Sequence, residues 1–117
     1  MSRVSIHIKP IPGSGFARVR TWSNGHLETD WVRPVDARLL EGIHLPVEYR
    51  ASTAVALIWL IEDWDVASVT ISNTSDGWRA EVDLFFLNQA CFGCGRGPTP
   101  VDAIRAAKLD ARNKTTY

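Results

Sequence analysis

The segment CFGCGRGPTP, residues 91–100, gathers the side chains of this sequence whose types and spacing most suggest chemistry. It contains both cysteines of the chain, Cys91 and Cys94, in the C-x-x-C spacing of metal-binding and redox pairs. It also contains three alternating glycines of the kind found in loops that cradle phosphate groups, namely Gly93, Gly95 and Gly97. The segment is therefore a metal site, a redox pair, a phosphate-binding loop or a tight turn.

Three of these four interpretations lack a necessary part. A closed zinc site needs two further ligands, and the histidines of the chain, His7, His26 and His44, are scattered over separate predicted elements. A redox pair is favoured at the N-terminus of a helix, whereas Cys94 precedes the predicted helix by several residues. A phosphate-binding loop needs amide donors and a Lys-Ser or Lys-Thr ending, but this segment ends in Pro100.

We therefore interpret the segment as the end of a strand followed by a turn. Cys91 and Phe92 continue a sheet, and the glycines adopt positive φ angles in a tight reversal. Thr99 then caps a helix whose first residue is Pro100. On this interpretation the cysteines are structural, and we expect neither a metal nor a cofactor.

No other set of residues predicts catalysis. An acidic cluster would have to combine Glu62 and Asp63, which close a predicted helix, with Asp65 and with Asp83, which alternates onto a solvent face. The histidines have no spaced serine, cysteine or carboxylate partner that would predict a triad. We therefore expect that the protein is not an enzyme.

Hydrophobic periodicity predicts the strands. Residues 4–8 alternate between apolar and polar side chains, which indicates a half-buried strand. Asn24-Gly25 and Asp76-Gly77 each stand between two alternating segments, and such turns are strong signals for a β-hairpin. In the second hairpin we expect Ile71 to face Val82 on the core side.

Two helices are predicted, over residues 52–63 with Ser52 as the cap and over residues 100–113. Residues 34–48 carry the weakest pattern and read as a short helical turn followed by a loop. This order of elements predicts an α+β fold, an antiparallel sheet of about five strands with two helices packed on it. We expect a single domain over residues 1–117.

The first hairpin carries the most informative candidate surface. With Asn24-Gly25 as the loop, its register pairs Trp22 with Leu27, Arg20 with Thr29 and Arg18 with Trp31. The residues that share this face are of the types that dominate binding hot spots, and we take them as candidate partner-binding residues: Arg18, Arg20, Trp22 and Trp31. In the alternative, the tryptophans pack on a helix and the arginines extend to solvent.

The two predicted helices carry further candidates. Arg105, Lys108 and Arg112 lie at helical spacing and form either a partner-binding stripe or a solvated face that complements the helix dipole. The first helix is apolar around most of its circumference. We expect Leu57, Ile58 and Ile61 in the core, and Trp59 partly accessible or at a subunit contact, which leaves a homodimer through this helix open.

Composition excludes several classes of protein. Lys plus Arg number 13 and Asp plus Glu number 13, so no strong non-specific binding of nucleic acid is expected. No apolar segment approaches the length that spans a membrane. The N-terminal residues MSRVSIHIK read as a strand rather than a targeting segment, so we expect a cytoplasmic protein.

Part of the sequence resembles known families. The segment from Tyr49 to Lys114 resembles a small domain of phage and prophage proteins, the phage ABA-sandwich type, in which two strands around a Gly-Trp turn follow an amphipathic helix. The segment GWRAEV…ACFGCGRGPTPVDAIRAA is also similar to the domain of HicB-type antitoxins, in which a helix begins with T-P-x-x-A. The resemblance implies a phage protein, whereas the composition, with five tryptophans and no catalytic set, indicates only that the protein binds a partner.

These observations lead to one functional hypothesis and two alternatives. The first is a phage-encoded inhibitor of the anti-CRISPR-like kind, which binds a host effector complex in the host cytoplasm and blocks it by occupying its surface. The second is a HicB-like antitoxin or regulatory module. The third is a small-ligand-binding domain that uses the Gly93–Gly97 loop.

Overall fold

The computed structural model describes residues 3–114, which form an α+β fold, as the sequence predicts. The elements in chain order are β1 (Val4–Ile11), β2 (Phe16–Ser23), β3 (His26–Pro34), α1 (Val47–Asp63), β4 (Asp65–Thr74), β5 (Gly77–Phe86), β6 (Gln89–Gly97) and α2 (Pro100–Lys114). The strands form one six-stranded sheet in the order β3-β2-β1-β4-β5-β6, and every neighbouring pair is antiparallel. The sheet has one strand more than expected because residues 89–97 pair with β5 along their whole length.

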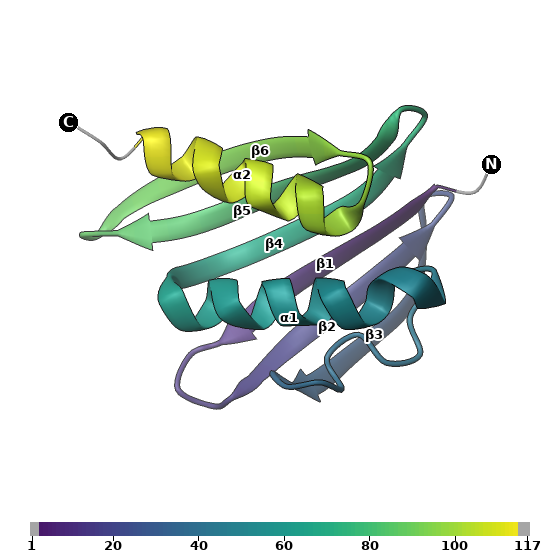
Figure 1. The fold of residues 1–117 in the computed structure, drawn as a ribbon. Helices are drawn as coiled ribbons and strands as arrows, with labels where there is room; N and C mark the ends of the chain where they lie inside the picture. Colours follow the sequence, from purple (N-terminus) through teal and green to yellow (C-terminus); the bar gives the residue numbers. More distant parts are fainter. Residues whose placement is uncertain (1–2, 115–117) are drawn as a thin grey trace.

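Both helices lie on the same face of the sheet, side by side and running in the same direction (Figure 1). We call this side the helix face and the other side the open face, because no element of residues 3–114 covers it. α2 lies over β5 and β6. Neither helix within these residues is long and apolar enough to cross a membrane.

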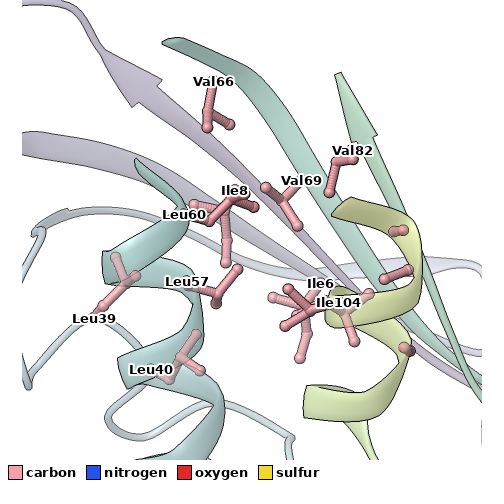
Figure 2. Packing of buried hydrophobic residues seen from close by; sticks show 14 of the residues in the cluster. Ile6, Ile8, Leu39, Leu40, Leu57, Leu60, Val66, Val69, Val82 and Ile104 are labelled. Atoms are coloured by element: carbon pink, nitrogen blue, oxygen red, sulfur yellow. The ribbon is translucent and has the colours of Figure 1, made fainter. Parts of the chain in front are cut away.

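The core fills the space between the sheet and the helices. Along β1, Ile6 and Ile8 point to the helix face and are fully buried, while His7 between them faces the open side. Figure 2 shows Leu57 of α1 and Ile104 of α2 pointing toward Ile6 from the two helices. The fold thus follows from the period of two in the strands and the apolar face of each helix.

The segment 35–46, which carries little pattern in the sequence, contributes to this core. Its leucines and isoleucine are almost completely buried, namely Leu39, Leu40, Ile43 and Leu45. Arg50 of α1 holds the segment in place, since its guanidinium donates hydrogen bonds to the carbonyl oxygens of Ile43 at 2.8 Å and Leu45 at 2.9 Å.

Helix α1 begins five residues earlier than predicted, at Val47. Ser52 is therefore not its cap but lies inside the helix, where its hydroxyl donates to the carbonyl oxygen of Tyr49 at 3.3 Å. Leu57 is fully buried, as expected, whereas Ile58 and Ile61, which were also expected in the core, are only half-buried. Trp59 is 64% exposed, in agreement with the prediction that it is accessible. For α2 the prediction of the start is confirmed, because the Asp102 amide donates to the Thr99 hydroxyl at 3.2 Å.

The register of the first hairpin differs from the prediction. Asn24 and Gly25 form the turn with positive φ angles, and Trp22 pairs with Leu27 as expected. A β-bulge next to Trp22 then shifts the register, so Arg20 pairs with Asp30 and Val19 pairs with Trp31. Because one extra residue reverses the side to which every later side chain points, Trp31 lies on the helix face and packs against the core.

The second hairpin keeps its faces although its register also differs. Its loop is Ser75-Asp76, one residue before the predicted one, so Ile71 pairs with Ala80 rather than Val82. The shift along β5 is two residues, an even number, and therefore Ile71 and Val82 both remain on the buried side.

Candidate functional site

The glycines of residues 93–97 allow α2 to lie directly on β6. A Cβ atom on Gly93 would stand 2.2 Å from the carbonyl oxygen of Ala107, and one on Gly95 would stand 2.2 Å from the Ala107 amide nitrogen. Both positions face a row of buried alanines on the helix, Ala103, Ala107 and Ala111. The glycines are therefore required for the contact between the backbones of helix and strand.

The predicted tight reversal with positive φ angles is therefore wrong. Gly93, Gly95 and Gly97 lie in β6 and have none of the positive φ angles found in the turn glycines. The Gly93–Gly97 loop, on which the small-ligand alternative depends, is not formed, because this segment is a paired strand with its glycine face under α2.

The same strand separates the two cysteines. Cys91 pairs with buried Leu84 on the helix face, whereas Cys94 pairs with Glu81 on the open face. The Arg79 guanidinium donates to the sulfur of Cys94 at 3.3 Å. Thiols on opposite faces cannot bind one metal ion together. Within residues 3–114 no three histidine, cysteine or acidic side chains gather in a metal-binding cluster.

The predicted four-residue surface on the first hairpin is divided between the two faces. Arg18, Arg20 and Trp22 lie on the open face, because they alternate with the buried Ala17, Val19 and Thr21. Asp30 stands between the two arginines, and its carboxylate oxygens lie 3.4 Å from the Nε atom of each. This carboxylate offsets part of the positive charge.

Trp31 lies on the helix face and contacts other side chains of the protein. The Arg33 guanidinium carbon lies 4.3 Å from the centroid of its ring, and Trp31 itself packs against the core. The alternative in which the tryptophan packs toward the helix layer therefore describes Trp31, while Trp22 stays on the open face.

A groove between the two helices brings together residues that the sequence treats separately. Its volume is about 510 Å³, and it runs between α1 and α2 on the outside of the helix layer. Val55 and Trp59, which are 45% and 64% exposed, form one wall. Leu60 and Ile104 contribute the apolar floor.

The other wall of the groove is cationic. It contains Arg105 and Lys108, the first two members of the predicted stripe on α2. Within residues 3–114 neither side chain has a carboxylate partner, unlike Lys114, whose Nζ atom lies 3.1 Å from Asp110. Arg112 lies one turn further along α2, is exposed, and does not line the groove.

One histidine is held at the centre of the open face. The Nδ1 atom of His7 lies 2.9 Å from the Thr70 hydroxyl, and its ring meets Trp22 edge-on, with 6.5 Å between the ring centroids. Burial, and then the charges of Arg20 and Lys9, lower the pKa of His7 below its usual 6.5. The neutral form of the imidazole is therefore favoured at neutral pH, and the contacts with Thr70 and Trp22 hold the ring in place.

Comparisons of the chain with family models, curated proteins and solved structures found no match. The sequence predicted that Trp59 is accessible and that Arg105 and Lys108 form a stripe, but not that these residues face one groove. The missing information was the parallel placement of the two helices, for which the sequence carries no local signal.

Proposed function

We propose that this chain is a non-enzymatic binding protein that occupies the surface of a protein partner through the groove between α1 and α2. The single observation that carries the proposal is the composition of this groove. An apolar floor lies between an exposed tryptophan and two cations that have no carboxylate partner among residues 3–114. Tryptophan and arginine are the residue types that most often dominate the energy of protein interfaces.

The groove fits one kind of occupant best, an amphipathic helix with an acidic flank. The groove runs between two parallel helices, and the apolar side chains of a third helix can pack along it as ridges into grooves. Trp59 and Val55 would contact the apolar face of this helix, while Arg105 and Lys108 would pair with carboxylates along its edge.

The biological class of the partner rests on the resemblance of residues 49–114 to phage and prophage domains. We propose that the chain acts as a stoichiometric inhibitor of a host defence complex, of the anti-CRISPR-like kind, by covering a surface that the complex needs. A HicB-like antitoxin is the alternative for the same groove, with a small toxin as its partner. Each of these classes needs binding and no catalytic step.

The test is capture of a partner by the tagged full chain in a bacterial host that carries a defence complex, followed by affinity measurement. Trp59→Ala and Arg105→Glu should each weaken binding by about 2 kcal/mol or more. Leu109→Ala, which removes another exposed apolar side chain of α2 outside the groove, is the matched control and should leave affinity unchanged. Equal binding by all variants would exclude the groove as the interface.

A second candidate, a homodimer through α1, is favoured by the exposure of Val55 and Trp59 on one side of that helix. Analytical ultracentrifugation of the isolated chain separates the two candidates. A concentration-dependent dimer that Trp59→Ala dissociates would assign the groove to a second copy, whereas a monomer at all concentrations leaves it for another protein.

A further inference from the structure

A wide trough crosses the open face at the end of the sheet where the β2–β3 and β4–β5 turns lie. Its volume is about 900 Å³, and its lining comes from four strands and both turns. The lining includes Arg3, Ser5, Trp22, Ser72 and Arg79. The trough lies on the open face, whereas the groove between the helices lies on the helix face.

The pairing of the strands explains the shape of the trough. One row of cross-strand neighbours runs from Trp22 of β2 to Ser5 of β1, Ser72 of β4 and Arg79 of β5. All four side chains point to the open face, because each lies next to a buried residue of its own strand: Thr21 before Trp22, Ile6 after Ser5, Ile71 before Ser72 and Ala80 after Arg79. Two small serines thus form a low floor between the large side chains of Trp22 and Arg79.

The polar groups of the floor are available to a ligand. The hydroxyls of Ser5 and Ser72 have no hydrogen-bond partner within residues 3–114. A serine hydroxyl both donates and accepts, so the pair can bind the hydroxyl groups of a sugar. The serines lie opposite one another across the β1–β4 pair, at the centre of the sheet.

Two arginines line the trough, and Glu81 beside it offsets part of the charge of one of them, Arg79. Among residues 3–114, the lining contains Arg3 and Arg79 and no carboxylate side chain. Arg79 is held in position by Glu81, 2.8 Å from its Nη2 atom, and by the sulfur of Cys94. Asn24 accepts a hydrogen bond from the amide of Arg3 at 3.1 Å and so anchors the beginning of β1 at the trough.

The aromatic wall is also held in one orientation. Trp22 is half-buried, and His7 contacts it edge-on at an interplanar angle of 68°. A ring that is fixed on one side and accessible on the other is a stacking platform for a planar base.

From this combination we infer that the trough binds a nucleoside phosphate. The base stacks on Trp22, the sugar lies over Ser5 and Ser72, and the phosphate pairs with the guanidinium groups of Arg79 and Arg3. This binding is a property of the open face and is independent of the partner groove on the helix face.

The inference is tested by isothermal titration of the full chain with AMP and ATP, and with adenosine and inorganic phosphate as halves of the ligand. The nucleotides should bind saturably and more tightly than either half. Trp22→Ala and Arg79→Ala should each raise the Kd for ATP by about tenfold or more. The controls are Phe16→Ala and Lys9→Ala, which remove an exposed aromatic and a cation of the same face outside the trough.

Further measurements make the outcome decisive. Ser72→Val fills the floor while keeping the strand, Trp22 and both arginines, so it should abolish binding without unfolding, as checked by circular dichroism. A short single-stranded oligonucleotide that displaces ATP and binds more tightly would identify a nucleic-acid strand as the source of the nucleotide, and failure to displace would identify the free nucleotide. The inference is overturned if neither probe binds saturably, or if binding survives Trp22→Ala, Arg79→Ala and Ser72→Val.

Failure of this inference can be distinguished from failure of the proposed function. Trp59→Ala and Arg105→Glu lie on the other side of the sheet and should leave the Kd for ATP unchanged. Conversely, Ser72→Val should leave capture of a protein partner intact.

Discussion

Gly95→Ala should destabilise the protein far more than a change of one methyl group normally does. The new Cβ atom would lie 2.2 Å from the backbone nitrogen of Ala107 and 2.6 Å from the carbonyl oxygen of Ala103. Ordinary van der Waals contact begins at 3.4 Å, so the helix must move away from the strand by about 1.2 Å. Overpacking of this kind typically costs about 1–3 kcal/mol and occasionally more.

The movement has a second cost. α2 buries Ile104 and three alanines against the sheet almost completely, and these contacts loosen together when the helix is lifted. We therefore expect Gly95→Ala to lower the free energy of unfolding by about 3 kcal/mol or more. The measurement is equilibrium unfolding in urea, with the m-value checked for two-state behaviour.

Two further variants separate close packing from backbone conformation. A Cβ atom on Gly25 would meet nothing within 4 Å, but this residue has a φ angle of 83°, so Gly25→Ala should cost only about 1 kcal/mol through strain. Adding Ala107→Gly to Gly95→Ala should not restore stability, because the clash is with the backbone of Ala107 and not with its side chain. A loss below about 1 kcal/mol for Gly95→Ala would refute the argument from close packing.

Three other outcomes are expected. Leu57→Ala should lower the free energy of unfolding by about 2–5 kcal/mol, since its side chain is fully buried; a smaller change in urea unfolding would contradict its place in the core. Cys91→Ser with Cys94→Ser should have only a modest effect on the melting temperature and none on partner binding, and loss of folding on chelation in the native protein would contradict this. Because the pKa of His7 is lower in the folded chain than the usual 6.5, the unfolded chain binds its proton more readily. The free energy of unfolding should therefore fall as the pH drops below 6.5, and His7→Gln should flatten this dependence in urea titrations at pH 5 to 8.

Much of the fold could be predicted from local patterns. Alternation identified the strand that contains Ile6 and Ile8, and Asn24-Gly25 identified a hairpin turn whose residues adopt the positive φ angles that this pair favours. Thr99-Pro100 predicted that the second helix begins at Pro100, and α2 begins at this residue. Each of these signals lies within a few residues, because turn geometry, capping and side-chain periodicity are properties of neighbouring residues.

The candidate surfaces were predicted only in part. The sequence predicted that Trp59 is accessible, which the structure confirms, and that Arg105 and Lys108 lie at helical spacing. Their common groove depends on how far apart the two helices lie on the sheet. The trough depends on the alignment of Trp22, Ser5 and Arg79, which come from three separate strands. Such a row exists only after the register of each strand pair is set.

What the sequence by itself determined is therefore the class of the fold and the position of most of its elements. Tertiary structure decided which side chains meet. A single extra residue in β3 places Trp31 on the helix face. The glycines that resembled a turn lie in a strand, and α2 packs directly on them. The physical reason is that pairing register and helix-to-sheet distance are set by the sum of many contacts between distant residues, and no local pattern records that sum.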